Sequence, residues 1–431
     1  MATSSRQTSI FGIEDWRSLY KTYNQADFQS YNFETLRKSF VDYLRQHHPE
    51  DFNDYVESSE FIALLDTMAF MGQAISYRQD LNTRENFLDT AERRDSVVRL
   101  ADLVSYTPKR NENASGYLKV TSVSTTENIT DFNGNSLANV TLRWNDSTNI
   151  DWQDQMNTVL NSMFVDSQKF GKPGNSTDVL GITTDEYTVN LVSNLMPVVP
   201  FNATVNGTNM DFEVVSATTA NATEVYEPAP SLNGDFNVLY RNDKLGFASE
   251  NTGFFFYFKQ GTLTNKDFTL SDRIANRNVD INTEGVNNND VWLYELNKTT
   301  GAVLSEWDEV KSIYAPITKQ TETSVRKYFS VTGRANDQIT MNFGDGVFGD
   351  IPTGFFRAFV RTSNGSKYII NKTDITGVDI TIPYISRNGR SETATFTVTL
   401  TQNISNASTN ESIADIKRNA PARFYTQNRM V

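Results

Sequence analysis

The stretch from Glu60 to Arg110 constrains this chain most, because its apolar residues do not keep to one side of a helix. Between Phe61 and Met71 only Asp66 and Thr67 are polar, so apolar side chains surround nearly the whole helical cylinder. A surface helix carries one apolar stripe, whereas a helix that is apolar all round is buried on several sides. Charged residues interrupt the stretch too soon for it to cross a bilayer, which needs roughly 20 apolar residues. We therefore expect other chains to cover part of this helix.

Two further helices are predicted in the first 110 residues, from Phe33 to Leu44 and from Val97 to Val104. Pro49 stops the first, and Asp95 is placed to cap the second. The core could instead be closed by the rest of the same chain. We favour burial by partner chains, because the helical part is small for the apolar surface that it carries. The predicted interface residues are Leu36, Phe40, Phe61, Leu64, Leu65, Met68, Met71, Ile75, Val97, Leu100 and Val104.

After Pro108 the sequence becomes rich in Thr, Asn, Ser, Val and aromatic residues that alternate with a period of two. That alternation is typical of half-buried strands. The continuous aromatic run Phe254–Phe258 indicates a strand that is covered on both faces. Two hairpins are predicted, one turning at Asn297–Gly301 and the other at Asn364–Gly365.

The predicted fold class is α+β with several domains: an N-terminal helical bundle segment followed by mainly antiparallel β domains. The stretch 153–164 is predicted to be a helix inserted among strands, and Ser412–Asn419 a short helix that ends before Pro421. The predicted domains are residues 1–110, a helical assembly domain; 111–325, a β-rich domain with the inserted helix; and 326–431, a second β region with a short C-terminal helix.

Composition narrows the class of protein further. The formal net charge of -13 disfavours a nucleic-acid binder, which needs clustered Lys and Arg to neutralise phosphates. The N-terminus lacks the basic, apolar and small-residue segments of a secretion signal. The chain has no Cys, which excludes disulfides, thiol nucleophiles and thiolate metal sites. We expect a protein made in a reducing cytoplasm, with no nucleic-acid or membrane partner.

Residues 344–349 read GDGVFG and match the G-x-G-x-x-G pattern of dinucleotide-binding loops. That pattern needs a helix after the loop, whereas a proline and a β-like run follow here, which argues strongly against a nucleotide site. The acids of this loop also lack the spacing and the closing Glu of an EF-hand. We interpret the loop as a structural turn in which the glycines act through backbone conformation. Its residues are Gly344, Asp345, Gly346, Gly349 and Gly354.

No catalytic constellation stands out. The two histidines, His47 and His48, are adjacent, so on a helix they point about 100° apart and cannot chelate one ion as an i, i+4 pair would. Glycosidase chemistry needs only two carboxylates, and composition alone does not exclude it in a chain with 52 acidic residues. No Asp or Glu stands out among aromatic residues as a candidate glycosidase carboxylate. We therefore expect no enzyme activity, no cofactor and no metal.

Three segments resemble one family. Residues 343–354, FGDGVFGDIPTG, resemble the strand–turn signature of baseplate J-like proteins. The helical block 57–110 looks like the N-terminal part of the large inner baseplate wedge subunit of T-even-type contractile-tailed phages. Residues 253–261, GFFFYFKQG, are similar to a middle segment of that subunit. The resemblance covers most of the chain in the same order, and the helical block is its most specific part.

The resemblance implies a structural virion protein of the tail baseplate, assembled in the bacterial cytoplasm. Such subunits form a ring of wedges around a central hub, and the N-terminal helices of two copies bundle with a neighbouring wedge protein. The implied partners are a second copy, other wedge proteins, and tail-sheath-initiating and hub-proximal proteins. In that family a C-terminal arm closes the ring. The present sequence ends at Val431, where the arm would begin, so we expect residues 424–431 to be exposed or held by a neighbour.

Two alternatives remain open from the sequence. Asn- and Thr-rich β domains also suit a receptor-binding tail protein or adhesin, which would present an exposed aromatic cleft for carbohydrate. A carbohydrate-cleaving enzyme would instead place two carboxylates opposite each other in a cleft.

Overall fold

The structure is a computed structural model, and it describes residues 32–47, 60–104, 106–131, 133–144, 150–165, 176–177, 181–192, 197–220, 224–246, 248–313 and 326–427. The chain divides into two compact units. One comprises the residues up to Ser105 together with those from Lys417 onward, and the other runs from Tyr106 to Ile416. A short helical segment is followed by mostly antiparallel strands, which confirms the predicted α+β class.

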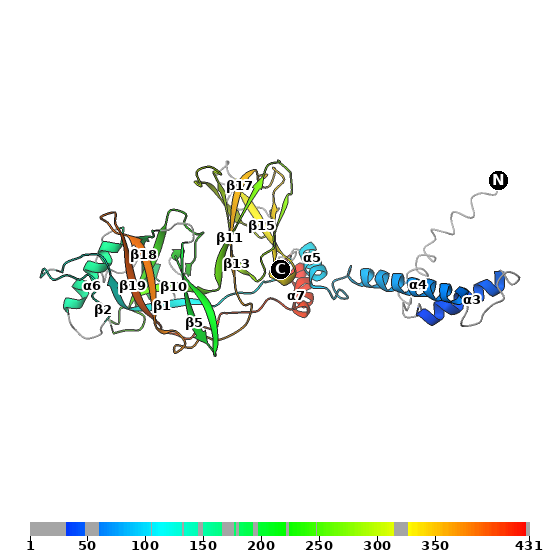
Figure 1. Cartoon of the computed structure of the whole chain (residues 1–431), viewed down its shortest axis with the longest axis horizontal. Helices are drawn as coiled ribbons and strands as arrows, with labels where there is room; N and C mark the ends of the chain where they lie inside the picture. Colours follow the sequence, from blue (N-terminus) through cyan, green and yellow to red (C-terminus); the bar gives the residue numbers. More distant parts are fainter. Residues whose placement is uncertain are drawn as a thin grey trace. The chain divides into compact units, whose positions relative to one another are not determined.

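The first unit is helical, and its elements are α3 (Phe33–His47), α4 (Glu60–Arg84), α5 (Arg94–Leu103) and most of α7 (Ile413–Gln427). Helix α3 begins where predicted, because the Asn32 side chain accepts a hydrogen bond from the backbone N–H of Thr35 at 2.8 Å. Helices α3 and α4 lie side by side (Figure 1) and are joined by an ion pair between Arg37 and Asp66 at 2.6 Å.

The N-terminus of α5 corrects one prediction. Asp95 lies in the first turn of the helix, and the residue at the N-cap position is Arg93. The carboxylate of Glu85 accepts the backbone N–H groups of Glu92 and Arg93 at 3.0 and 3.1 Å. A hydrogen bond from the Ser96 side chain, together with these two backbone hydrogen bonds, lowers the pKa of Glu85. Glu85 of the preceding turn therefore pairs the N–H of the N-cap residue Arg93, which the helix itself leaves unpaired.

Helix α7 corrects a second prediction, because it continues through Pro421 to Gln427. A proline inside a helix removes one hydrogen bond and costs about 3 kcal/mol, but it does not forbid the helix. Ile416 and Ala420 are fully buried on its inner side. Lys417 donates to the backbone oxygen of Asp89, 3.0 Å away. Residues 428–431 and the side chains of 423–427, on which the prediction about the C-terminus depends, lie outside the described residues.

In the described part of the second unit, ten strands form one antiparallel sheet, here called the first sheet. Its central path runs β18-β19-β1-β10-β9-β4-β3, and β2, β5 and β6 pair at its sides. The bounds are β1 Ser115–Thr125, β2 Leu142–Arg143, β3 Ser176–Thr177, β4 Thr183–Asn190, β5 Val198–Val205, β6 Thr208–Val215, β9 Asp235–Asn242, β10 Gly253–Gln260, β18 Thr376–Ile385 and β19 Ser391–Leu400. A two-stranded hairpin, β7 (Thr218–Ala220) and β8 (Glu224–Tyr226), precedes β9.

The first sheet folds back on itself around one apolar core. A bridge between Leu191 and Tyr384 connects the end of β4 to β18, at the opposite end of the strand order. Helix α6 (Ile150–Met163), the predicted inserted helix, contributes its buried residues to the same core. Strand β10 is covered on both faces as predicted, because Phe254, Phe256 and Phe258 lie in this core and Phe255 lies in a second cluster.

Among the described residues between Thr262 and Thr362, seven strands form a second sheet, which lies between β10 and β18 in the chain and is here called the inserted sheet. Its order is β11-β17-β13-β14-β15-β16-β12, with only β14 and β15 parallel among the described pairs. The bounds are β11 Thr262–Leu270, β12 Asn278–Ile281, β13 Val286–Leu296, β14 Val303–Glu309, β15 Tyr328–Gly333, β16 Ile339–Phe343 and β17 Gly354–Thr362. It has an apolar core of its own that includes Trp307, Phe329, Phe343 and Phe356.

The two predicted hairpins have different outcomes. β13 and β14 pair across Asn297–Gly301, with Gly301 at φ +70°, so the first hairpin is confirmed. The second is wrong, because β17 already pairs with β11 and β13 on its two edges. The chain after Gly365 instead returns to the first sheet, where Ile370 forms a bridge with Ile404. Both sheets contain strands from each side of the domain boundary expected at residues 325 and 326.

Candidate assembly surface

Helix α4 has an inner stripe that faces α3. Ile62, Leu65 and Ala69 recur at helical spacing and are buried. Gly72 continues the stripe, and a Cβ at this position would lie 3.3 Å from the Leu36 side chain of α3. The spacing i, i+3, i+7, i+10 places these residues on one side of the helix. This inner stripe therefore packs within the chain, and the absence of a side chain at Gly72 lets the two helices approach closely.

A second apolar stripe on α4, here called the outer stripe, is exposed. It consists of Leu64, Met68, Met71 and Ile75, whose exposed fractions range from 49% to 62%. Successive members are four, three and four residues apart, which is the spacing of a and d positions in a coiled coil. Methionine adapts to irregular partner surfaces, because its side chain is unbranched and polarisable. The outer stripe therefore has the pattern of a seam for another helix.

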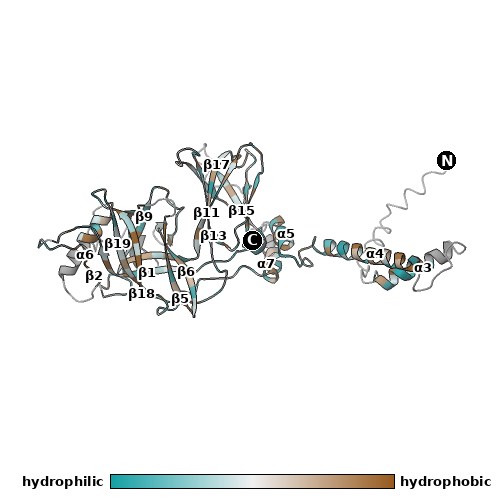
Figure 2. Ribbon diagram, viewed as in Figure 1, coloured by the Kyte–Doolittle hydropathy of each residue, from teal (hydrophilic) through white to brown (hydrophobic). Residues whose placement is uncertain are grey.

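A third stripe, here called the side stripe, lies next to the outer stripe. Phe70 and Tyr77, which are 64% and 65% exposed, are its large members. Ala63, Thr67 and Ala74 are its small members, and all three are exposed. Four of these five residues immediately precede a residue of the outer stripe, so the two stripes lie about 100° apart on the helix. Figure 2 shows brown, apolar residues recurring along α4.

The predicted interface residues therefore divide into three groups. Leu64, Met68, Met71 and Ile75 are exposed on the outer stripe. Leu65 and Val97 are buried within the chain, and Leu36, Phe40, Leu100 and Val104 are partly buried. The side chain of Phe61 lies outside the described residues. The side stripe was missed, although the seven-residue spacing of Phe70 and Tyr77 was a signal for it.

The glycine loop between β16 and β17 is closed by its backbone. The N–H of Gly346 donates to the oxygen of Gly349 at 2.8 Å, and the N–H of Asp350 donates to the oxygen of Arg326 at 2.8 Å. A Cβ on Gly344 would overlap the backbone of Gly349. Gly346 and Gly354 have positive φ, at +89° and +122°. Two glycines therefore permit left-handed conformations and one permits a close approach.

Asp345 acts inside this loop as a hydrogen-bond acceptor. Its Oδ1 atom accepts the backbone N–H groups of Val347 and Phe348 at 2.8 and 3.0 Å. These hydrogen bonds lower the pKa of Asp345, because they stabilise the ionised carboxylate. The arrangement is an Asx turn, which orders a loop without any ligand.

Among the residues that the structure describes, no group of three or more His, Asp or Glu side chains is placed to hold a metal ion. No helix in the described ranges is both long and apolar enough to span a bilayer. The side chain of His47 and the whole of His48 lie outside the described residues.

Comparison with known families agrees with the geometry of the helices. Residues 32–103, which contain α3, α4 and α5, match the profile of the bacteriophage baseplate protein N-terminal domain. The chain is therefore a phage baseplate protein with a structural role, located in the tail baseplate of the virion and in contact with other baseplate proteins. Residues 116–403, well over half of the chain, match a domain of unknown function, DUF8360, and the chain belongs to that family. No curated protein matches the chain.

Proposed function

We propose that this protein is a wedge subunit of a contractile-tail baseplate, and that its N-terminal helices bundle with a second copy and with a neighbouring wedge protein. The observation that carries the proposal is the pair of apolar stripes on α4 that α3 leaves exposed. In this proposal the wedges form a ring around the central hub, and tail-sheath-initiating and hub-proximal proteins are further neighbours. The resemblance of residues 343–354 to the strand–turn signature of baseplate J-like proteins is part of the same proposal.

The number of stripes supports two helical partners. A single added helix covers one seam of a and d positions, because its side chains insert between those of the facing helix. The outer and side stripes are about 100° apart, so one straight helix cannot cover both. With α3 on the inner stripe, α4 would have a helix on each of three sides. One partner is then a second copy of α4, and the other is a helix of a different wedge protein.

Engineered cysteines can assign a partner to each stripe, because the natural chain has none. Ile75→Cys places a thiol on the outer stripe and Phe70→Cys places one on the side stripe. Leu245→Cys is the control, since Leu245 is 81% exposed and lies in the second unit. Each variant is assembled with the other baseplate proteins and treated with a short thiol-reactive cross-linker.

We expect a cross-linked dimer of this chain from one stripe and a cross-link to a different baseplate protein from the other. The control should give neither product. If both stripe variants remain uncross-linked monomers inside assembled wedges, a segment of the same chain covers α4 and the proposal is wrong.

We also expect the protein to have no catalytic activity. The purified chain should release no sugar from peptidoglycan or from other glycans, measured as reducing ends over several hours. A phage lysozyme in the same assay is the positive control. Glycan hydrolysis that a single carboxylate substitution abolishes would contradict the structural interpretation and favour the glycosidase alternative.

A further inference from the structure

The inserted sheet is attached to the first sheet through two adjacent strands. Thr262 begins the insert and Thr362 ends it, and these two residues are partners in the pairing of β11 with β17. Gly261, which joins β10 to β11, has φ +116° and approaches the backbone of Thr362 so closely that a Cβ would clash there. The insert therefore leaves and re-enters the first sheet at one point, through a two-strand stem.

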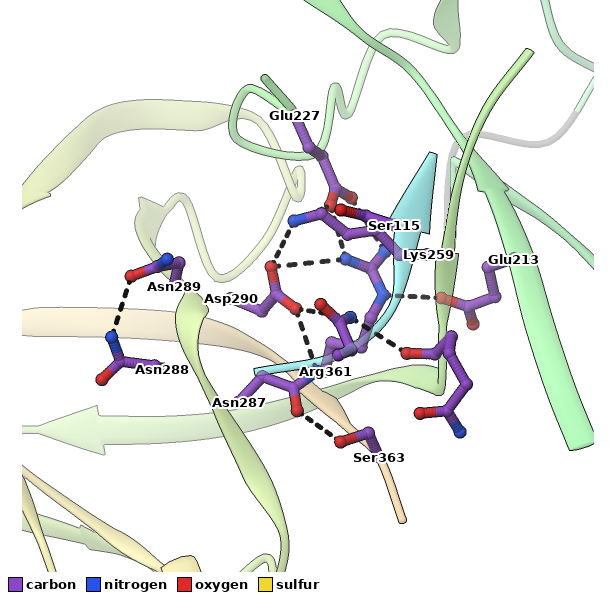
Figure 3. A network of polar contacts seen from close by, with 12 residues as sticks. Ser115, Glu213, Glu227, Lys259, Asn287, Asn288, Asn289, Asp290, Arg361 and Ser363 are labelled. Atoms are coloured by element: carbon purple, nitrogen blue, oxygen red, sulfur yellow. Dashed lines mark hydrogen bonds and ion pairs between the residues drawn. The ribbon is translucent and has the colours of Figure 1, made fainter. Parts of the chain in front are cut away.

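Five charged side chains are buried beside this stem (Figure 3). Arg361 of β17 donates from Nε to Glu213 of β6 at 3.0 Å, and from its two terminal nitrogens to Glu227 at 2.5 and 2.8 Å. Lys259 of β10 donates to Asp290 of β13 at 2.5 Å and lies 2.9 Å from Glu227. The exposed fractions of these side chains range from 0% to 11%. We call these five residues the ionic cluster.

The pairs of the ionic cluster join one sheet to the other. Arg361 and Asp290 belong to the insert, whereas Glu213, Glu227 and Lys259 belong to the region of the first sheet. Both insert members of the ionic cluster, Arg361 and Asp290, therefore meet an opposite charge from outside the insert at hydrogen-bond distance.

Uncharged polar side chains add hydrogen bonds between the inserted sheet and the rest of the unit. The side-chain amide of Asn111 donates to Asn287 at 2.8 Å and to Ser363 at 2.7 Å. The buried polar groups at the stem are therefore linked in one network.

The surrounding charges favour the ionised forms of Asp290 and Arg361. Burial opposes the charge on Asp290, but Lys259 and Arg361 outweigh it and lower the pKa of this carboxyl. Burial likewise opposes the charge on Arg361, but Glu227 and Asp290 raise its pKa. Glu213 differs, because burial dominates there and raises its pKa despite Arg361. Removing one partner would leave an opposite charge buried without compensation.

An apolar contact between the sheets lies beside the ionic cluster. Tyr294 and Phe359 of the insert cluster with Leu263, and Leu232 of the segment before β9 packs against them. The hydroxyl of Tyr294 donates to the backbone oxygen of Pro230 at 3.1 Å. Apolar contacts are non-directional and tolerate changes of angle, whereas hydrogen-bonded ion pairs require one relative placement of their partners.

We propose that the ionic cluster is a conformational lock, which holds the inserted sheet in one orientation on the first sheet at a stem that would otherwise act as a hinge. Buried ion pairs contribute little net stability, because desolvation offsets their attraction, so their effect here is on orientation. Loss of one member weakens this hold, and the insert then turns about Gly261 and Thr362 as far as the remaining hydrogen bonds of Arg110 and Asn111 to Asn287 and Asn288 allow. Both sheets stay folded, because each has an apolar core of its own.

The distance between the two sheets tests the lock. Spin labels on Thr269→Cys and Thr381→Cys place one probe on an exposed position of each sheet, in a chain without other cysteines. We expect a single narrow distance distribution for the otherwise natural chain and a broad or split one for Arg361→Met. Arg357→Met is the matched control, because Arg357 lies on the same strand but pairs with Asp267 inside the inserted sheet. The control should keep the narrow distribution.

Glu227→Gln provides a second variant if Arg361→Met does not fold. It keeps the shape of the side chain and removes one charge, and we expect the same broadening from it. Amide hydrogen exchange should show that strands β9 and β16, in the two cores, stay protected. An unchanged narrow distribution in a folded Glu227→Gln or Arg361→Met chain would overturn the proposal. So would simultaneous loss of protection in both cores, because the sheets would then be one cooperative unit without a hinge.

Discussion

Met68→Asp should abolish assembly of the protein into baseplate wedges while leaving the chain folded. Met68 is half exposed at the centre of the outer stripe, so its replacement does not disturb the packing of α4 on α3. In the proposed bundle the new carboxylate would be buried without a partner, which costs about 3–5 kcal/mol. That cost corresponds to a loss of affinity of roughly 100- to 4,000-fold. Sedimentation of mixtures with the other wedge proteins measures the loss, and circular dichroism checks the fold.

Leu65→Asp, on the inner stripe, tests folding of the helical pair and not assembly. Leu65 is 5% exposed on the inner stripe, so this variant should lose the α3–α4 pair itself, seen as reduced helical signal in the isolated chain. Leu245→Asp is the control for adding a charge at an exposed apolar position, and it should assemble normally. Normal assembly of Met68→Asp would show that the outer stripe is not an interface.

The periodicity of the sequence was sufficient to identify α4 as a helix that is apolar on several sides. It was not sufficient to say which side meets α3, and Leu65 was therefore grouped with Met68 although the two face different ways. The difference depends on where α3 packs, and that depends on contacts such as Leu36 with Gly72. Local spacing defines stripes, whereas tertiary packing decides which of them remain exposed.

The β region shows the same limit on a larger scale. Strands such as β10 and β19 were recognisable from their alternation, because each half-buried strand carries its own pattern. Their partners were not recognisable, since β1 pairs with β19 far along the chain, as at Leu118 and Leu400, where 400 − 118 gives a separation of 282 residues. The turn at Asn364–Gly365 had the right local chemistry for a hairpin. Both edges of β17 were already paired with β11 and β13, which no local signal reveals.

The ionic cluster had no sequence signal for a related reason. Its members come from five separate segments, and Glu213 and Arg361 are 148 residues apart. A charged residue directly after an apolar run, such as Arg361 after Ala358, Phe359 and Val360, is the one local hint that a buried partner exists. The partner itself becomes visible only in the folded chain.

Gly344→Val should destabilise the inserted sheet by about 3 kcal/mol, because the loop has no room for a side chain at this position. A Cβ there would overlap the backbone of Gly349. The loop cannot open to relieve the clash without breaking the hydrogen bond from Gly346 to Gly349. Phe343, the preceding residue, is 1% exposed in the core of the inserted sheet. Its ring lies 5.5 Å from that of Trp307, so tryptophan fluorescence during urea unfolding reports on the damage.

A graded series distinguishes the causes within the loop. Gly346→Ala should cost less than Gly344→Val, about 1–2 kcal/mol, because it strains a left-handed residue without a backbone clash. Asp345→Asn should leave the unfolding midpoint unchanged, since an amide oxygen can accept the same two backbone N–H groups as the carboxylate. Equal effects of all three substitutions would contradict this account of the turn. Tight calcium or nucleotide binding that Asp345→Asn removes would instead show that the loop is a ligand site.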